Sequence, residues 1–530
     1  MDVEGVMVSY NYSEAGEHAK ILTVSASGIK FSERWVLTHG SILSPLKEAE
    51  AIRNAKRNPI LNQEFYDKLP EIYVTCEKVY TQNPDVYDEV EHLSWVRSVS
   101  NNNDFEHSSY LIRVLTGRIC HVWQCPILER CVDDVLYSWT IGHRDADVQQ
   151  QTQLGKALLS VFVLIDLESD NLVQQPLRPL SELLDLVHPP PGRGSVVEVQ
   201  STPFGCEVFL NAVTRGSVCG VVGRRPSLLL TDAATALGSE GGPVFSFGEN
   251  RQLVGAVVCS VSWWRGEWVG LSLVAPLRAV LTAKLHVPAA PLLPSLPPTE
   301  HMQHFKALLD TIDSTTVLVR CGAAWGAGVY LGGGHSVTCA HVVKNHETEK
   351  VTVYCQGVKE TAIVRYKASD DVAYDIALVY SNPQNWKHLT AVTFTLEQPK
   401  KGEPVLAAGF PYFSENNLTD VRPMVTRGHL NNVSPSMLQT SCCVQSGFSG
   451  GPIFRLSRGT AEVLGITVSN AKTETGAYYP YINMAIPARA FVTHMKDYIL
   501  NKDKTKLREI ENKNEVVQSQ WRLLPYRSKI

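Results

Sequence analysis

The chain has 530 residues, of which 44% are hydrophobic and 19% charged, with a formal net charge of −4 and an isoelectric point near 6.5. This length suits two or more domains, each with a sizeable core. The slightly acidic balance gives no reason to expect nucleic acid or an anionic membrane as a partner, and no apolar run approaches the length of a membrane span.

The start of the chain lacks the basic region and apolar core of a secretory signal, so none is expected. The chain has 12 cysteines but no Cys-x-x-Cys spacing, which argues against a zinc ribbon or a thioredoxin-type site. Without a signal, free thiols in a reducing compartment are the expectation. No motif calls for a metal ion or another cofactor.

Short apolar stretches alternate with polar ones through the first half, which favours β-strands. Residues 1–45 contain three such stretches, and residues 111–166 return to apolar strands after a more polar segment. Region 46–230 is longer than a compact barrel domain needs and is interpreted as insertions. We expect residues 1–286 to form one all-β domain.

A proline-rich segment divides the chain. Residues 287–300 hold five prolines and predict a semi-rigid, extended linker. Beyond it we expect a second all-β domain over 301–500, with a short helix over 305–312. Apolar residues at helical spacing predict another helix over 489–501. Residues 501–530 are expected to form a charged tail.

The most informative motif is Gly-Phe-Ser-Gly-Gly-Pro at 447–452. A serine hydroxyl attacks a carbonyl only when it projects from a tight turn and two amides face the developing oxyanion. Gly447 permits the backbone that would aim its own N–H and that of Ser449 into one oxyanion hole. Gly450 and Gly451 are expected to let the substrate backbone come close. The alternative is a glycine-rich hairpin with an incidental serine.

Two further segments supply the partners that such a serine needs. Thr-Cys-Ala-His at 338–341 follows an apolar stretch, and Tyr-Asp-Ile-Ala-Leu at 374–378 begins another. A lone histidine or aspartate is usually structural, but here the three segments follow in the order His341, Asp375, Ser449. In a catalytic triad, Ser449 would attack, His341 would take and return the proton, and Asp375 would orient the imidazole.

The first half repeats these segments in altered form, which indicates an internal duplication. Gly-Gly-Pro recurs at 241–243 and places Glu240 where Ser449 stands. Because a carboxylate cannot perform the acyl chemistry of a serine, we expect the first copy to be a degenerate scaffold.

The other two triad positions of the first copy are assigned by alignment. The segment that contains His39 is similar to the one that contains His341, and both follow a short apolar strand. The position that matches Asp375 is Ser160 in one alignment and Asp166 in another.

With these motifs in place, the second half resembles trypsin-like serine proteases of the high-temperature-requirement (Deg-like) branch. Segments similar to that branch follow in the same order at 406–411, 425–428, 438–440 and 483–487. The resemblance implies a trypsin-like double β-barrel. The whole chain, with one degenerate and one intact copy, resembles a family of peroxisomal processing proteases.

This resemblance implies a serine endopeptidase of the peroxisomal matrix. Its substrates would be imported enzymes, from which it removes N-terminal targeting presequences, and certain β-oxidation enzymes that it cuts internally. Members of the family prefer a cysteine before the scissile bond, cleave themselves and self-associate, which makes a homodimer the expected assembly. No nucleic acid and no membrane span is implied.

The last three residues, Ser528, Lys529 and Ile530, are similar to the Ser-Lys-Leu address that the peroxisomal import receptor reads. Ile530 has a similar volume to leucine but is β-branched, so we expect recognition with weaker affinity. The import receptor is therefore an expected partner.

The specificity pocket follows from the position of the nucleophile. In this fold the residue six before the serine, here Cys443, lies at the base of the pocket for the side chain that precedes the cut. Ile466, Thr467 and Val468 are expected to form its wall. An unpaired basic side chain would lose several kcal/mol there, whereas Cys, Ala or Val would fit. Cys76, Cys120, Cys125 and Cys131 lie in or beside the insertions, and one of them on an exposed loop is an expected site of self-cleavage. Cys76 ranks first because charged residues follow it.

Two alternatives remain open. One is a Deg-like quality-control protease elsewhere in the cell, against which the lack of a PDZ-sized segment and the terminal tripeptide count. The other is a non-catalytic scaffold, against which His341, Asp375 and Ser449 count.

Overall fold

The computed structural model describes most of the chain. The residues outside the description are 1–2, 14–20, 55–60, 62, 80–95, 100–109, 137–154, 168–176, 223–225, 248–250, 265–266, 288–299, 412–420, 457–460, 473–477, 512 and 523–530. The chain forms two compact units, one of residues 1–262 and 271–293, the other of residues 263–270 and 294–530. The expected linker lies almost wholly outside the described residues, and so do Ser528, Lys529 and Ile530.

Six strands of the first unit close into a barrel in the order β1-β2-β3-β7-β6-β4, with β5 added beside β6. They are β1 (Glu4–Ser13), β2 (Ile21–Lys30), β3 (Trp35–His39), β4 (Ile72–Val79), β5 (Val96–Val99), β6 (Tyr110–Gln124) and β7 (Val161–Asp166). The helical segments of this part are η1 (Gly40–Leu43), α1 (Ala49–Asn54), α2 (Gln63–Asp67) and α4 (Pro126–Leu136).

A second barrel of the first unit closes in the order β8-β9-β10-β13-β12-β11. Its strands are β8 (Val196–Ser201), β9 (Ala212–Val222), β10 (Leu228–Thr231), β11 (Pro243–Ser246), β12 (Gln252–Trp264) and β13 (Glu267–Pro276). With it go α6 (Leu177–Leu186), η3 (Pro203–Gly205), η4 (Glu207–Phe209) and α7 (Leu277–Leu285).

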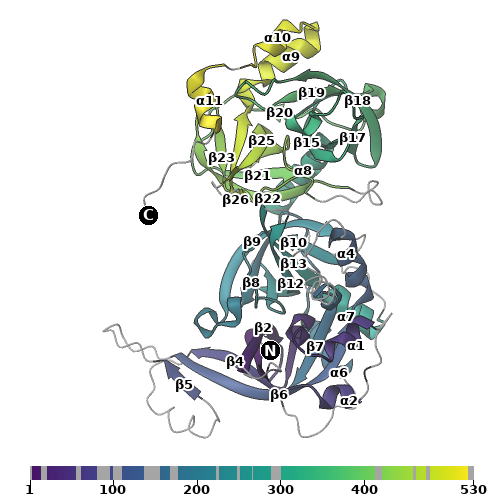
Figure 1. Ribbon diagram of the computed structural model, residues 1–530, viewed down its shortest axis with the longest axis vertical. Helices are drawn as coiled ribbons and strands as arrows, with labels where there is room; N and C mark the ends of the chain where they lie inside the picture. The colour runs from purple at the N-terminus through teal and green to yellow at the C-terminus, as the bar shows by residue number, and fades with distance from the viewer. Residues whose placement is uncertain are drawn as a thin grey trace, which may run out of the picture. The chain divides into compact units, whose positions relative to one another are not determined.

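The second unit repeats this plan (Figure 1). Its first barrel closes in the order β14-β15-β16-β19-β18-β17. The strands are β14 (Thr316–Cys321), β15 (Ala324–Gly332), β16 (His335–Thr338), β17 (Val351–Cys355), β18 (Val358–Lys367) and β19 (Ala377–Tyr380). The helical segments are α8 (Glu300–Thr315), η5 (His341–Val343) and η6 (Pro383–Trp386).

The second barrel of this unit closes in the order β21-β22-β23-β26-β25-β24, with β20 beside β25. The strands are β20 (Thr393–Phe394), β21 (Pro404–Gly409), β22 (Met424–Val433), β23 (Leu438–Thr440), β24 (Pro452–Arg455), β25 (Glu462–Lys472) and β26 (Tyr478–Pro487). After it come η8 (Ala488–Ala490), α9 (Val492–Asn501), α10 (Thr505–Arg508) and α11 (Glu515–Arg522).

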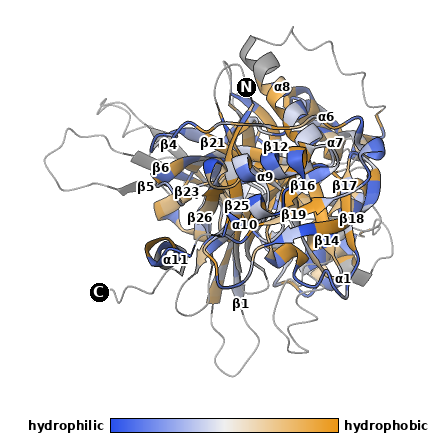
Figure 2. Cartoon of the chain, turned by 90° about the horizontal axis from the view of Figure 1, so that it is seen from above, coloured by the Kyte–Doolittle hydropathy of each residue, from blue (hydrophilic) through white to orange (hydrophobic). Residues whose placement is uncertain are grey.

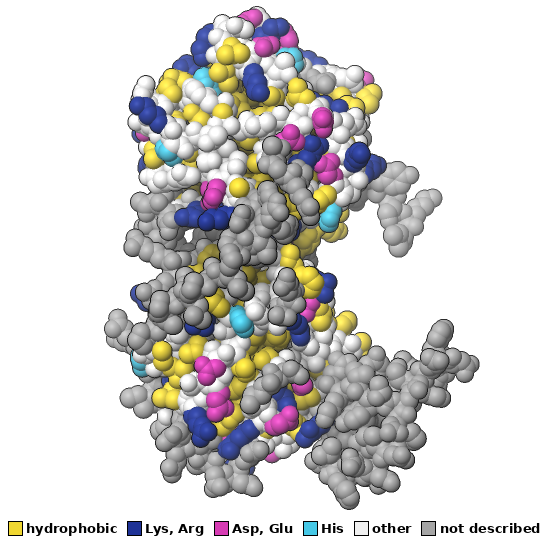
Figure 3. All heavy atoms as spheres, turned by 180° about the vertical axis from the view of Figure 1, so that it is seen from behind, with side chains coloured by type: hydrophobic (Ala, Val, Ile, Leu, Met, Phe, Trp, Pro, Cys, Tyr) yellow, Lys and Arg dark blue, Asp and Glu magenta, His cyan; other side chains and the backbone are white. Residues whose placement is uncertain are grey.

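These strands and barrels confirm the all-β, duplicated barrel fold. Hydrophobic residues follow the barrel strands, as the orange segments along β14 and β19 show (Figure 2), because one face of each strand packs into a barrel interior. One large core cluster of the second unit extends from Val317 through Leu406 to Tyr498. On the face seen in Figure 3, basic and acidic side chains are interspersed. None of the described helices is long and apolar enough to cross a membrane.

The helices differ from the expectation in extent. The helix expected over 305–312 is α8, which is longer at both ends, and the helix expected over 489–501 begins as η8 and continues as α9. The segment expected as a charged tail contains α10 and α11, which the sequence analysis did not predict.

All twelve cysteines are free thiols, and three of them are partly exposed: Cys120, Cys206 and Cys259. Cys76, the expected self-cleavage site, is buried in β4, where its backbone pairs with β6. That expectation is wrong, because a peptide bond held in a barrel ladder cannot enter a protease cleft. The charged neighbours that suggested a loop belong to a strand.

Candidate active site

His341 and Asp375 are joined across the edge of the first barrel of the second unit. His341 begins η5, three residues after the end of β16, and Asp375 lies two residues before β19. The ring Nδ1 of His341 lies 2.5 Å from Oδ2 of Asp375, and the backbone N–H of His341 donates to Oδ1 at 2.9 Å. Both carboxylate oxygens are therefore engaged by one histidine, which fixes the imidazole with Nε2 free to act.

The carboxyl of Asp375 is electrostatically prepared for this role. Burial raises its pKa, but the hydrogen bonds and charge of His341, with the backbone N–H of Ala340, outweigh burial and lower the pKa below its ordinary value of 3.8. Asp375 is therefore ionised at neutral pH, as a residue that stabilises an imidazolium must be.

Ser449 stands on a tight turn between β23 and β24. The N–H of Phe448 donates to the carbonyl of Gln445 at 3.0 Å, and Gly447, the third residue of that turn, has φ +98°. A type II turn requires such a positive φ at its third residue. A Cβ on Gly447 would also lie 2.2 Å from the carbonyl oxygen of Phe410, so only glycine fits.

The turn leaves two N–H groups available. Within the described part of the chain, neither the N–H of Gly447 nor that of Ser449 donates a hydrogen bond, whereas the N–H groups of Phe448, Gly450 and Gly451 all do. An oxyanion hole requires two such N–H groups close to the serine hydroxyl and without another acceptor.

Glycine is required at 450 and 451 for a different reason from the one expected. A Cβ on Gly450 would lie 2.2 Å from the carbonyl oxygen of Ala327, and a Cβ on Gly451 2.0 Å from that of Ala408. The backbone that approaches these glycines is that of β15 and β21, not that of a substrate. They allow the serine turn to sit directly against both barrels.

The hydroxyl of Ser449 is turned away from the histidine in this state. Its Oγ donates to the carbonyl of Val468 at 3.2 Å, and no hydrogen bond joins it to His341 within the described chain. A hydrogen bond to the imidazole would require another staggered rotamer of the serine side chain, which must leave the Val468 carbonyl.

The expected pocket residues do not share one surface. Cys443 is fully buried, and its thiol donates to the carbonyl of Val269 at 3.3 Å. Ile466, Thr467 and Val468 are consecutive in β25, so Thr467 faces away from the other two. Ile466 and Val468 belong to the barrel core. The specificity pocket therefore stays a prediction, with Cys443 as its base.

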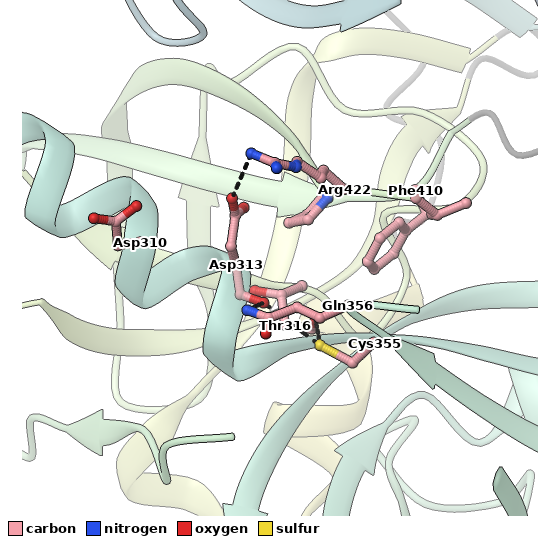
Figure 4. A pocket seen from close by; sticks show the side chains of 9 residues that line it. Asp310, Asp313, Thr316, Cys355, Gln356, Phe410 and Arg422 are labelled. Atoms are coloured by element: carbon pink, nitrogen blue, oxygen red, sulfur yellow. Dashed lines mark hydrogen bonds and ion pairs between the residues drawn. The ribbon is translucent and has the colours of Figure 1, made fainter. Parts of the chain in front are cut away.

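A cavity of about 380 Å³ in the second unit lies beside this site (Figure 4). It is lined by the end of α8, the turn between β17 and β18, and the segment before β22, including Asp313, Gln356 and Arg422. None of His341, Asp375 and Ser449 lines it. Phe410 does, and its N–H donates to the carbonyl of Gly447 at 2.9 Å, so cavity and serine turn share a wall.

Cys339 lies close to His341 and Asp375, and the potential ligand atoms of the three lie within 4.8 Å of one another. The thiol of Cys339 is buried and donates to the carbonyl of Thr467 at 3.3 Å. Burial, and then the charge of Asp375, raise its pKa well above 9.0. A protonated, engaged thiol is a poor metal ligand, so hydrogen bonding accounts for this trio.

The first unit preserves the backbone of the serine turn. The N–H of Ser27 donates to the carbonyl of Glu240 as that of Ala327 donates to Ser449, at 2.9 and 2.8 Å. Gly238 has φ +92°, close to the +98° of Gly447. Glu240 thus occupies the place of Ser449, as the sequence indicated.

The register of the strands corrects the other two assignments. Thr38 pairs with Val163, and the corresponding Thr338 pairs with Ala377. Both threonines donate to the strand before, at 2.6 and 2.7 Å. Counting from this pair, His341 corresponds to Ser41, and Asp375 corresponds to Val161.

His39, Ser160 and Asp166 are therefore not triad counterparts. His39 is buried, its Nε2 lies 3.1 Å from the carbonyl of Leu159, and burial lowers its pKa to about 4. The Ser160 hydroxyl accepts a hydrogen bond from Gln124, and Asp166 is paired with Arg34 through two bonds of 2.8 Å. All three are structural, so the first copy has lost every member of the triad.

Glu240 fills the oxyanion hole of its own copy. Its Oε2 accepts the N–H of Gly238 at 2.8 Å, the donor that corresponds to the unengaged N–H of Gly447. Burial raises the pKa of Glu240, while hydrogen bonds from the N–H groups of Glu240, Gly238 and Ser260 oppose that rise. One side chain thus replaces the nucleophile and closes the hole.

Proteins similar to this chain include proteases. Residues 326–466 match the family model of the trypsin-like peptidase domain. The chain is 36% identical to the peroxisomal leader peptide-processing proteases of Mus musculus, over 355 residues, and Homo sapiens, over 352 residues. Each match covers 62% of this chain and 60% of the relative, so the chain spans less than two thirds of these relatives. The resemblance drawn from the motifs is confirmed.

Solved structures give a weaker likeness. A serine endoprotease from Yersinia pestis is 22% identical with a TM-score of 0.31, covering 39% of this chain and 69% of its own. Deg5 is 19% identical with a TM-score of 0.31, covering 39% of this chain and 98% of its own. Scores this low establish no correspondence between sites.

Several residues of the site were not found from the sequence. Trp325 donates from its indole to the carbonyl of Phe410 at 2.9 Å, and Val468 holds the serine hydroxyl through its backbone. Backbone groups leave no signature in the side-chain sequence. A single tryptophan in an apolar stretch carries no signal that its indole N–H bonds a distant carbonyl.

Replacement of Glu240 by Gln tests whether the Glu240 carboxyl fills the oxyanion hole of the first unit, because its effect on folding stability should then depend on pH. An acid whose pKa is raised on folding stabilises the protein below its unfolded pKa, near 4.5, and that contribution is lost as pH rises through the folded pKa. We therefore expect the stability of Glu240→Gln relative to wild type to increase as pH rises above about 4.5. Thermal unfolding across a pH series measures this.

The matched control is Glu182→Gln, because the Glu182 side chain is 49% exposed. Its difference from wild type should not follow the same curve. A flat difference for Glu240→Gln would show that its carboxyl is not held in the buried hole.

Proposed function

We propose that this chain is a serine endopeptidase of the trypsin-like type, active through the second unit. The observation that carries the proposal is the hydrogen-bonded pair of His341 and Asp375 in one barrel, with Ser449 and two unengaged N–H groups in the next. A scaffold needs no such arrangement, and the first unit, where the hole is filled, provides the contrast.

The mechanism follows from these atoms. Ser449 Oγ leaves the Val468 carbonyl, gives its proton to Nε2 of His341 and bonds to the carbonyl carbon of the scissile peptide. The N–H groups of Gly447 and Ser449 receive the oxyanion. The imidazolium, held by Asp375, then protonates the leaving amine as the C–N bond breaks. Water repeats the sequence on the acyl-enzyme, with His341 again as base.

The names of the mouse and human relatives support a narrower proposal. The chain acts in the peroxisomal matrix, where it removes leader peptides from imported enzymes and processes imported β-oxidation enzymes internally. Self-association as a homodimer remains part of this proposal. The uncharged base at Cys443 supports a small side chain, such as cysteine, before the cut.

Replacement of Ser449 by Ala should lower peptide-bond cleavage by several orders of magnitude, because no other group supplies the nucleophile. Replacement of Glu240 by Ala should leave cleavage at the wild-type rate, since the first copy lacks all three triad residues. Turnover of a leader-peptide substrate, followed by mass spectrometry, measures both. Wild-type activity in Ser449→Ala would refute the assignment.

We also propose Cys206 as the site of self-cleavage, in place of Cys76. It is the partly exposed cysteine that lies outside the strands, between η3 and η4. Its backbone is extended, with φ −109° and ψ 127°, and neighbouring Val208 is 84% exposed. Cys206 joins two short turns and its carbonyl accepts the N–H of Phe209 at 2.8 Å, so only these two turns, and no strand ladder, must open for the segment to enter a protease cleft.

Incubation of the purified protein should then yield a new amino terminus at Glu207. Cys206→Ala should abolish that fragment without changing turnover of an added peptide, and Ser449→Ala should abolish both. Cys259→Ala, in β12, is the control and should be cleaved like wild type. Fragmentation of Cys206→Ala at the same position would rule the site out.

The address at Ser528, Lys529 and Ile530 lies outside the described residues and stays a prediction. Deleting these three residues should move a fusion with a free carboxyl terminus from peroxisomes to the cytosol, because the receptor reads the tripeptide. Fluorescence microscopy against a peroxisomal marker measures this. Unchanged distribution after the deletion would dismiss the address.

A further inference from the structure

The loop that carries Asp375 needs an external support. It runs from β18 to β19 and is closed at its neck by one backbone hydrogen bond, from the N–H of Ala368 to the carbonyl of Ile376 at 2.9 Å. Within it Asp371 is exposed, while Tyr374, the neighbour of Asp375, is buried. The position of Asp375 therefore depends on what packs against Tyr374.

Helix α11 provides that packing. The rings of Trp521 and Tyr374 meet edge to face, with centroids 6.1 Å apart and planes at 89°. One turn earlier, the side-chain amide of Gln518 donates to the backbone carbonyl of Asp371 at 2.9 Å. The helix thus contacts the Asp375 loop at two points, the backbone of Asp371 and the ring of Tyr374.

The same helix also contacts the second barrel. The indole N–H of Trp521 donates to the carbonyl of Ser436 at 3.2 Å, and the hydroxyl of Ser436 donates to Gln520 at 2.5 Å. Ser436 lies in the turn between β22 and β23. After β23 the chain continues into the segment that carries Ser449. Trp521 therefore touches the Asp375 loop with its ring and the second barrel with its N–H.

We propose that α11 is a positioning element that ties the Asp375 loop to the second barrel, with Trp521 as its central residue. The inference rests on the proposed protease function. Asp375 and His341 come from one barrel and Ser449 from the other, so the alignment of the three depends on contacts between barrels. Helix α11 makes such a contact, because it touches both the Asp375 loop and the second barrel.

The geometry distinguishes this role from general stabilisation. Trp521 and Val517 are only partly buried and pack against the edge of the core, so their loss leaves the barrels intact. A displacement of the aspartate by about 1 Å, however, costs about a hundredfold in rate. We therefore expect the chemical step to respond more strongly than stability or substrate binding.

The test uses the full chain and a fluorophosphonate probe, whose phosphorus is attacked by an activated serine with loss of fluoride. Labelling at several probe concentrations separates the maximal rate from the half-saturating concentration. Trp521→Ala should lower the maximal rate between about tenfold and a hundredfold, with the half-saturating concentration unchanged. Trp521→Phe keeps the ring contact with Tyr374 but loses the N–H to Ser436, so it should recover only part of the rate.

Val516→Ala on the same helix is the control, because the Val516 side chain is 66% exposed, and should label like wild type. If Trp521→Ala does not fold, Gln518→Ala removes one surface hydrogen bond to the loop and should still lower the maximal rate. Wild-type labelling in both Trp521→Ala and Gln518→Ala overturns the inference. Absence of labelling in the wild-type chain itself would instead contradict the proposed function.

Discussion

The candidate site depends on one close approach of backbone to backbone. The N–H of Ala327, in the first barrel of the second unit, donates to the carbonyl of Ser449, which belongs to the second barrel. That contact is possible only because residue 450 has no Cβ, since one would lie 2.2 Å from the carbonyl oxygen of Ala327. Because His341 and Asp375 come from the first barrel, this approach brings nucleophile and base together.

The same approach is preserved in the first unit, where the N–H of Ser27 donates to the carbonyl of Glu240 and Gly241 takes the place of Gly450. The triad side chains are replaced there by Ser41, Val161 and Glu240, so the contact serves the fold as well as the site. Close packing of two barrels accounts for the conserved glycine pattern between the two copies. The side chains that perform chemistry were free to change around it.

The sequence predicted the residues whose chemistry dictates their surroundings. The glycines around Ser449 and the apolar strands beside His341 and Asp375 are required by a strained turn and two strand ends, so they appear together in the chain. His39 lies two residues before Ser41, the true counterpart of His341. The sequence did not reveal this offset, because two histidines near strand ends are readily aligned with each other. Only the pairing of Thr38 with Val163 reveals the register.

Other features left too little pattern to predict. Helix α11 has only eight residues and follows a highly charged stretch, and a helix this short depends on packing for its stability, so its local sequence indicated a tail. Neighbouring residues of a strand lie on opposite faces, so the run of Ile466, Thr467 and Val468 does not by itself define one pocket wall, and that wall stays a prediction. Contacts between distant segments, which a local pattern does not carry, matter in both cases.

The filled hole at Glu240 also bears on the history of the chain. A single reversion of Glu240 to serine would restore a hydroxyl, yet Ser41 and Val161 would still stand where the base and its carboxylate are needed. It would also strip the N–H groups of Gly238 and Ser260 of their acceptor, a loss of the order of 1–3 kcal/mol for buried polar groups. That single step is therefore less stable and no more active, so a return to the triad cannot begin with a gain at Glu240.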